Sequence, residues 1–426
     1  MRGISLRKTL QLGDKLWLED PSAVSKARLS KIFSASQQTN RYDIFLSHTW
    51  HTHGAWKFLC LLLHFGWPIV FLFWAFGVVL AYMLVLLDIL PLTTTWEAVA
   101  VDFQSTVPYG CWVMVIASTA AVLGLLASPY FPLKSDMCFL DFVCVNQTDD
   151  KKMKEGIRAI GAFLAASSEL RVLWSAPYLD RLWCLFELAA YRKLNPQGRI
   201  VMLPVTGEIT VLLMHIWVQV ASAAFWIART GPRGGDPVRV VVAVSCSFLV
   251  VFPTLAHAAW QKHSASEALQ QRLAQFDLTT VQCANDFDKN CIHEAIITWY
   301  GSLQAFTDHI RGPFRLEVIR LLRAEGTIPI HWISLLLIPI LNLSFEGLLA
   351  LWKASAPSVS FLTYFMAQVI GVIVLWLPSV GLFGVYASVH GVRYGHWRLR
   401  PFMLEFFLVF CLCAVLFIAG MSFSAA

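Results

Sequence analysis

Long apolar runs are the feature that most constrains this chain. Residues 58–90 are almost wholly apolar, and a second run covers residues 110–127. A helix needs about 20 apolar residues to cross the hydrocarbon core of a bilayer. The composition agrees, because 57% of the 426 residues are hydrophobic and 14% are charged, whereas soluble domains are about 25% charged. The sequence therefore predicts an integral membrane protein that contacts the lipid bilayer directly.

The apolar runs predict an α-helical transmembrane region of about seven spans. The predicted spans are residues 58–90, 110–127, 209–228, 238–260, 328–352, 359–388 and 402–423. They divide the chain into an N-terminal segment (1–57) with a strand at 41–48, a two-span hairpin (58–127), an α/β block (129–207), a second two-span hairpin (208–260), a polar helical segment (261–327) and three further spans (328–426). Residues 1–40 are expected to form surface helices and a flexible lead-in, and residues 91–109 a loop.

The positive charges predict the orientation of these spans. All but four of the 33 lysines and arginines lie in residues 1–57, 129–207, 261–327 and 387–401. The exceptions are Arg229, Arg233, Arg239 and Lys353. Because cytosolic loops of membrane proteins carry an excess of Lys and Arg, we expect the N-terminus and the polar blocks to be cytosolic. The C-terminus is then extracellular or lumenal, in a membrane that the sequence does not identify.

Neither metal nor nucleic-acid binding is indicated. The ten cysteines include no CxxC pair, which excludes the common zinc spacings. His48, His51 and His53 lie close together but have no neighbouring Cys or carboxylate ligand, so we assign no metal site. The net charge of +6 follows from the cytosolic loops, and the basic residues form no nucleic-acid-binding motif.

Residues 139–205 read as a parallel α/β unit. Three apolar runs, FLDFVCV, LRVLW and RIVMLPV, alternate with segments of helical period. Ile157, Ile160 and Leu164 share one helix face, and Trp183–Leu188 begin another helix. Strands that alternate with helices are typical of a parallel sheet. The strand candidate at 41–48 can join this sheet, because the hairpin 58–127 leaves the cytosol and returns to it.

Four motifs in this order resemble a TIR domain. YDIFLSH resembles the first strand of that family, FLDFV the second, LRVLWSAPYLDRLWCLFEL the third strand with its helix, and RIVMLPV the fourth. LDFVCVNQTDDKK is also similar to the heterokaryon-incompatibility version of the fold. The resemblance implies a TIR-like, flavodoxin-like parallel sheet of four to five strands, with a membrane hairpin inserted after the first strand.

The resemblance also implies candidate catalytic residues. NAD-cleaving TIR domains use a glutamate on the helix after the second strand, where a carboxylate can stabilise an oxocarbenium-like transition state. The candidates here are Glu155 and Asp150. Counting back from Ser175 places the family's glutamate nearer Ile157, which lies on a different side of the helix from Glu155. Asp150 has helix capping as its alternative role. No cofactor is required, and NAD is expected only as a substrate if the domain is an enzyme.

Other polar residues are candidates for a ligand-binding crevice at the carboxyl ends of the strands. They are Asp43, Ser47, Asp141 and Ser175. The alternative is that such aspartates tie down neighbouring loops. The residues that carry the family motif are interpreted as determinants of the fold, with Glu187 anchoring its helix to the strand ends; they are Tyr42, Phe45, Trp183, Cys184 and Glu187.

Three functions fit these features. The first is a membrane-anchored cytosolic TIR-like protein for signalling or scaffolding, which contacts TIR-like proteins, adaptors or a second copy of itself. The second is a TIR-type NAD glycohydrolase, and the third is a channel or transporter regulated by the TIR-like domain. The polar segment 261–327 has two amphipathic helix patterns, which are expected either to pack on the α/β block or to lie on the inner membrane surface.

Overall fold

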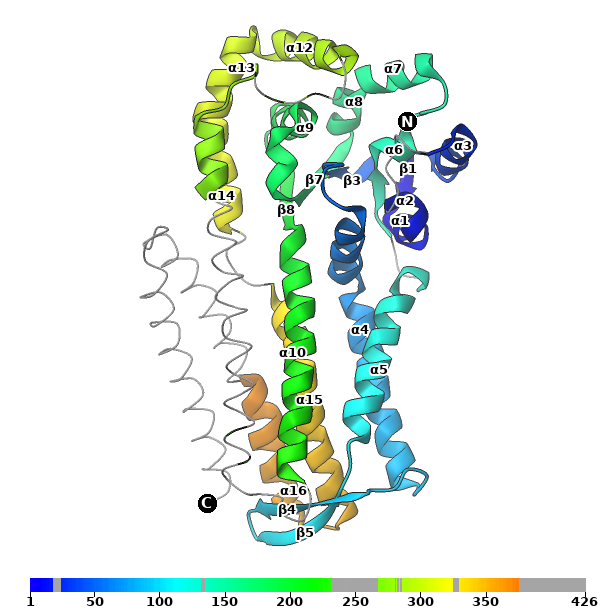
Figure 1. The fold of residues 1–426 in the computed structure, drawn as a ribbon, viewed down its shortest axis with the longest axis vertical. Helices are drawn as coiled ribbons and strands as arrows, with labels where there is room; N and C mark the ends of the chain where they lie inside the picture. Colours follow the sequence, from blue (N-terminus) through cyan, green and yellow to red (C-terminus); the bar gives the residue numbers. More distant parts are fainter. Residues whose placement is uncertain are drawn as a thin grey trace. The chain divides into compact units, whose positions relative to one another are not determined.

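The chain forms two compact units, which are described separately. A computed structural model describes residues 1–17, 24–131, 135–230, 267–279, 286–324 and 329–374, with the single residues 239, 242, 281 and 283. The first unit comprises residues 1–64, 129–209 and 264–325, and the second comprises residues 65–128, 210–263 and 326–426. Figure 1 labels the elements of both. The predicted spans at 238–260 and 402–423 lie outside the described residues, and the span at 359–388 is described only as far as Val374.

A six-stranded sheet organises the first unit, in the order β2-β1-β6-β3-β7-β8. The strands are β1 (Arg2–Ser5), β2 (Gln37–Gln38), β3 (Tyr42–Ser47), β6 (Met137–Phe139), β7 (Ser167–Trp174) and β8 (Arg199–Pro204). Strands β6, β3, β7 and β8 are parallel to one another, whereas β1 is antiparallel to both β6 and β2. The predicted α/β class with a parallel sheet is therefore confirmed.

The sheet differs from the prediction at two places. The apolar run FLDFV was expected to be one strand, but β6 ends at Phe139 and a helical turn begins at Asp141. Residues 1–40 were expected to contain helices and a flexible lead-in, yet they also supply β1 and β2. These strands have only four and two residues, too few to show an apolar pattern, and β1 pairs with both β2 and β6.

Helices surround this sheet within the first unit. They are α1 (Leu6–Gln11), α2 (Gly13–Trp17), α3 (Lys26–Ser34), α6 (Asp141–Cys144), α7 (Asp150–Arg158), α8 (Ile160–Ala165), α9 (Leu182–Leu194), α12 (Asp286–Tyr300), α13 (Leu303–His309) and α14 (Arg315–Ala324). Helix α9 contributes much of the buried core of this unit, since nine of its 13 residues are buried. Its Tyr191 hydroxyl donates to the Ser168 carbonyl oxygen at 2.9 Å, which ties α9 to β7.

The polar segment after residue 264 belongs to the α/β unit. Helix α12 lies against α7 and α9, and the Trp299 ring stacks on Phe186 of α9 with 5.4 Å between centroids. The Arg192 guanidinium of α9 pairs with the Glu317 carboxylate of α14. Of the two placements expected for this segment, the structure therefore has the one in which it packs on the α/β block.

The second unit is mainly helical and apolar. Its elements are the greater part of α4 (Gly54–Leu86), α5 (Trp112–Ala127), the greater part of α10 (Val205–Arg229), α15 (Ile330–Lys353), α16 (Ser358–Phe365), and the strands β4 (Thr94–Ala100) and β5 (Phe103–Tyr109). Helices α4 and α10 begin in the first unit and continue into the second. Residues 91–109, which were expected to form a loop, contain the β4–β5 hairpin.

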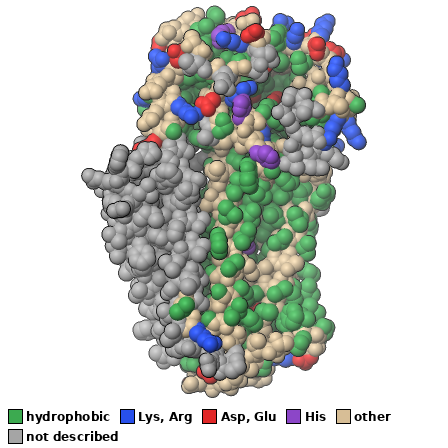
Figure 2. All heavy atoms as spheres, in the orientation of Figure 1, with side chains coloured by type: hydrophobic (Ala, Val, Ile, Leu, Met, Phe, Trp, Pro, Cys, Tyr) green, Lys and Arg blue, Asp and Glu red, His purple; other side chains and the backbone are tan. Residues whose placement is uncertain are grey.

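Four described helices are long and apolar enough to cross a membrane, namely Gly54–Leu86, Trp112–Tyr130, Val205–Arg229 and Ile330–Lys353. On the face that Figure 2 draws, hydrophobic side chains cover much of the described surface of this unit. Phe76 is 64% exposed, and Ile227 is 65% exposed. Such a large exposed apolar surface is unfavourable in water and favourable in lipid, which agrees with a membrane protein.

Two polar side chains inside this helical unit, Glu346 and Asn342, form hydrogen bonds to neighbouring helices. The Glu346 Oε2 atom accepts hydrogen bonds from the backbone N–H groups of Val113 at 2.8 Å and Met114 at 3.3 Å, at the start of α5. Asn342 accepts a hydrogen bond from the Trp74 indole at 2.8 Å and donates to Ser118 at 3.0 Å. These contacts join helices where water cannot satisfy polar groups.

Candidate functional site

Strand β3 lies where the connections of the sheet change direction. The chain leaves β3 for its neighbour β6 on one side, then passes to β7 on the other side. In open α/β sheets, the carboxyl ends of the strands at such a point border the usual ligand-binding crevice. The residues that follow β3 and β7 therefore form the candidate site.

A buried hydrogen-bond network occupies the carboxyl end of β3. The Ser47 hydroxyl lies 2.5 Å from Glu187 Oε2 and 2.6 Å from the Tyr178 hydroxyl. Tyr178 also donates to the Cys184 carbonyl oxygen at 3.2 Å, and the Trp183 indole N–H donates to Glu187 Oε1 at 2.8 Å. Ser47, Tyr178 and Glu187 are each at most 3% exposed. Both carboxyl oxygens of Glu187 thus have protein partners, and the network ties α9 to the end of β3.

The surroundings of Glu187 oppose its ionisation. The Ser47 hydroxyl donates to Glu187 Oε2, and the Trp183 indole N–H donates to Oε1. Burial raises the pKa of Glu187 to about 8, although these two hydrogen bonds oppose the rise. The neutral carboxyl is therefore more favoured in the folded chain than in water.

A buried cation lies beside this network. The Lys57 side chain, in the first turn of α4, is 1% exposed and donates to the Thr49 carbonyl oxygen at 3.1 Å. Its Nζ atom lies 4.6 Å from the centroid of the Trp50 ring. The Asp141 carboxylate accepts hydrogen bonds from its neighbour Phe142 and from Trp50, while burial raises the pKa of Asp141. Lys57, Trp50 and Asp141 thus interact with one another at this end of the sheet.

The other predicted crevice residues lie at different places. Asp43, in the first half of β3, accepts a hydrogen bond from the Met137 backbone N–H at 2.8 Å and so ties β3 to β6. Ser175 follows β7, and its hydroxyl lies 2.5 Å from that of Thr52. The structure therefore places Ser47 beside Glu187 and Ser175 beside the loop that follows β3. Asp43 lies apart from both and connects the beginning of β3 to the beginning of β6.

Four of the five residues of the fold motif are buried, and Trp183 is partly exposed. Tyr42 donates to the Arg2 carbonyl oxygen at 2.8 Å, and Phe45 stacks on Phe139 with 4.6 Å between ring centroids. The Cys184 thiol donates to the His48 carbonyl oxygen at 3.4 Å, and burial raises the pKa of Cys184 well above the usual range. A buried thiol of this kind is unreactive.

The two candidate catalytic carboxylates lie on the surface of α7. Glu155 and Asp150 are both exposed, and α7 lies against α8 and α12. Asp149, directly before the helix, accepts hydrogen bonds from the backbone N–H groups of Lys151 and Lys152 and is the N-cap. A cavity of about 510 Å³ lies beside α7, lined by residues that include Phe33, Asn146, Lys152, Gly156 and Phe163. Neither Glu155 nor Asp150 lines it.

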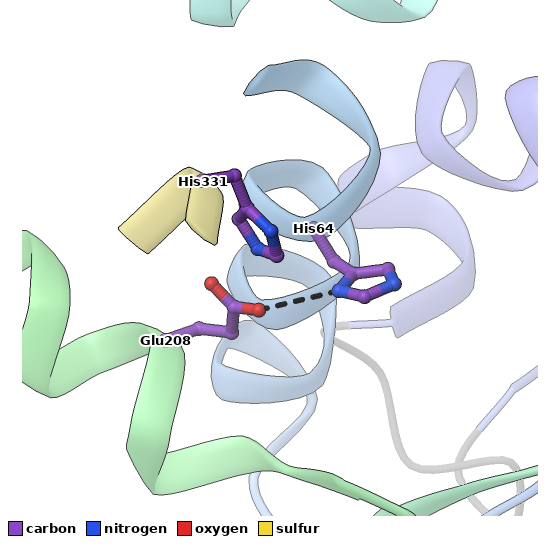
Figure 3. A group of neighbouring side chains, drawn as sticks. All are labelled: His64, Glu208 and His331. Atoms are coloured by element: carbon purple, nitrogen blue, oxygen red, sulfur yellow. Dashed lines mark ion pairs between the residues drawn. The ribbon is translucent and has the colours of Figure 1, made fainter. Parts of the chain in front are cut away.

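A contact between a histidine and a carboxyl group joins α4 and α10 within the first unit. His64 Nδ1 lies 3.4 Å from Glu208 Oε1, as the dashed line in Figure 3 marks. Glu208 is 2% exposed. Figure 3 also draws His331 of α15, which belongs to the second unit. Within the first unit the pair fixes the beginnings of two apolar helices to one another.

Sequence reasoning missed Lys57, Trp50 and Tyr178 as members of the site. Lys57 stands between a histidine-rich loop and an apolar run, where a lysine normally contacts lipid headgroups or water. Only the fold shows that its side chain turns toward the sheet. Tyr178 belongs to the motif LRVLWSAPYLDRLWCLFEL, so the family pattern could have indicated it.

Comparisons with protein-family models, curated proteins and solved structures found no significant match. The resemblance to TIR domains therefore rests on the four sequence motifs and stays a proposal.

Proposed function

We propose that this protein displays a TIR-like α/β domain at a membrane and acts in signalling or scaffolding through protein contacts. The motifs of β3, β6, β7 and β8 support this assignment, as does the strand order β6-β3-β7-β8, which flavodoxin-like sheets share. The charge distribution of the loops supports a cytosolic location for the domain.

The observation that carries the proposal is that the buried polar groups at the carboxyl end of β3 are engaged with one another. Glu187 has hydrogen-bond partners for both oxygens, and the Lys57 ammonium lies beside the Trp50 ring. An enzyme of this class needs an accessible carboxylate next to its substrate. The exposed candidates, Glu155 and Asp150, lie on α7 and do not line the cavity beside that helix. A protein-binding role depends on neither carboxylate.

The surface of α7 is the part that we expect to bind a partner. Lys151 and Lys152 are exposed there, next to the loop that follows α6. Exposed charges at the edge of an interface steer association and select the partner. The partner is then another TIR-like or adaptor protein with an acidic patch, or an acidic patch on a second copy of this chain.

Energy transfer between labelled copies in lipid vesicles tests the proposal. We expect transfer that rises with protein density and falls in the K151E/K152E double variant. The matched control is K26E/K31E, which reverses two exposed lysines of α3 and should leave the transfer unchanged. The same vesicles, incubated with NAD, should release no nicotinamide. Release that is lost in Glu155→Ala would instead identify a TIR-type NAD glycohydrolase, and equal transfer in all variants would contradict a contact through α7.

A further inference from the structure

Lys57 is an unusual residue for the interior of this unit. It is 1% exposed, and lysines are almost never fully buried unless they are paired. Removing an ammonium group from water is costly unless protein groups replace its hydration. The groups around Lys57 should therefore be arranged to bind a cation.

Three kinds of group surround the Lys57 ammonium. The Thr49 carbonyl oxygen accepts a hydrogen bond at 3.1 Å. The Trp50 ring lies 4.6 Å from Nζ and the Trp17 ring 6.0 Å from it, both within the range of cation–π attraction. Asp141 attracts the ammonium electrostatically and accepts a hydrogen bond from Trp50, so it also orients the indole.

We infer that Trp17, Trp50, the Thr49 carbonyl and Asp141 form an ammonium-binding site at the carboxyl end of β3, which Lys57 fills from within the chain. Aromatic faces beside a carboxylate are the chemistry that recognises alkylammonium cations. The ligand class is therefore a primary alkylammonium, and Lys57 is its permanent occupant. This inference does not depend on the proposed signalling function.

Because Lys57 belongs to α4, its binding in this site connects the apolar helix α4 to the segment that follows β3. Lys57 stands in the first turn of α4, and Thr49 and Trp50 follow β3 directly. His48, in the same segment, contacts the rings of both Trp17 and Trp50 with 5.7 Å and 4.5 Å between centroids. A movement of α4 that withdraws Lys57 would thus loosen the segment from His48 to Trp50.

The rate at which the Cys184 thiol is alkylated indicates whether the segment from His48 to Trp50 has loosened. Its thiol donates to the His48 carbonyl oxygen at 3.4 Å and is 3% exposed. A loosened segment would open the path to the thiol through local unfolding. Cys138 and Cys144, which are also buried, lie in β6 and α6 and serve as internal controls for unfolding of the whole unit.

The test is chemical rescue of Lys57→Ala in the full chain, reconstituted in lipid nanodiscs. Alanine removes three carbons and the ammonium, and n-propylammonium supplies the same atoms. We expect Cys184 to be alkylated about tenfold faster in the variant, because the local opening becomes easier, with Cys138 and Cys144 still protected. Propylammonium should restore the slow rate, whereas 1-propanol and sodium chloride of equal ionic strength should not. The control variant Lys31→Ala, at an exposed lysine of α3, should behave like the wild type.

Three results with Lys57→Ala would overturn the inference. The first is a wild-type alkylation rate of Cys184. The second is a faster rate that propylammonium does not reverse, and the third is a faster rate that 1-propanol reverses equally well. If Lys57→Ala does not fold, Trp50→Leu and Trp50→Phe decide the question with Lys57 in place. We expect Cys184 to react faster in Trp50→Leu than in Trp50→Phe, because only phenylalanine keeps an aromatic face, and equal rates would exclude the site.

Discussion

Glu187 illustrates how burial sets the chemistry of a single residue. A glutamate on a helix after a strand can serve as a catalytic carboxylate or as a structural tie. Here both oxygens accept hydrogen bonds, from Ser47 and from the Trp183 indole, and burial raises the pKa of the carboxyl to about 8. A buried carboxyl with both oxygens engaged holds α9 on the sheet and is poorly suited to stabilise a developing positive charge.

The proton on Glu187 predicts the pH dependence of stability. The pKa of Glu187 is about 8 in the folded chain, against an ordinary value of 4.5. Between these pH values the folded state keeps a proton that the unfolded state has released. The contribution of Glu187 to the free energy of unfolding is therefore complete below about pH 4.5, and it falls by at most about 1.4 kcal/mol for each pH unit as the pH rises toward 8. Above about pH 8 it falls no further.

The variant Glu187→Gln should remove this pH dependence and still fold. The glutamine carbonyl oxygen can accept from Trp183, and its amide N–H can donate to Ser47, whose hydroxyl then donates to Tyr178. Glu187→Ala should lose about 1–3 kcal/mol, because the buried partners are left unsatisfied. Thermal unfolding of the full chain in nanodiscs between pH 5 and pH 9 measures both. A Glu187→Gln profile as steep as that of the wild type would show that another group causes the slope.

At the scale of elements, apolar pattern predicted the centre of the sheet and missed its edges. The runs LRVLW and RIVMLPV became β7 and β8, because a central parallel strand is buried on both faces and reads as a continuous apolar run. Strand β1 has the sequence RGIS, which is too short to show an alternating pattern. Its pairing with β6 could therefore not be predicted from the sequence. The β4–β5 hairpin did carry a signal, because Trp96 and Ala98 alternate with exposed residues and both are buried.

Helix α12 offers a test of how residues after 264 contribute to the α/β unit. Ile296 is fully buried, whereas its neighbour Ile297 is 48% exposed. Ile296→Ala should destabilise the unit by about 2–5 kcal/mol through lost packing and the cavity left behind. Ile297→Ala should change the stability by no more than about 0.5 kcal/mol. Thermal unfolding of the full chain, followed by tryptophan fluorescence, compares the two. Equal effects would mean that α12 does not pack through this face.

At the scale of the whole molecule, the sheet is assembled from chain segments that are far apart in sequence. Strand β3 and its two neighbours β6 and β7 are separated by a hairpin of two long apolar helices, α4 and α5. The pairing of Phe45 with Phe139 and with Leu170 requires that hairpin to bring the chain back. The sequence could predict this return from charge alone, but the position of Lys57 depends on side-chain packing that no periodic pattern encodes.

The return of the hairpin predicts the membrane topology. If β3 and β6 share a sheet, residues before α4 and after α5 must lie on the same side of the membrane. The turn between β4 and β5, where Asp102 has a φ of 56°, then lies on the opposite side. The charges favour a cytosolic sheet, since residues 91–109 contain no Lys or Arg. An N-glycosylation acceptor inserted at the Val101–Asp102 turn should be modified in microsomes, while one inserted before Asp150 should not. Modification at Asp150 alone would reverse the orientation, and modification at both sites would contradict the shared sheet.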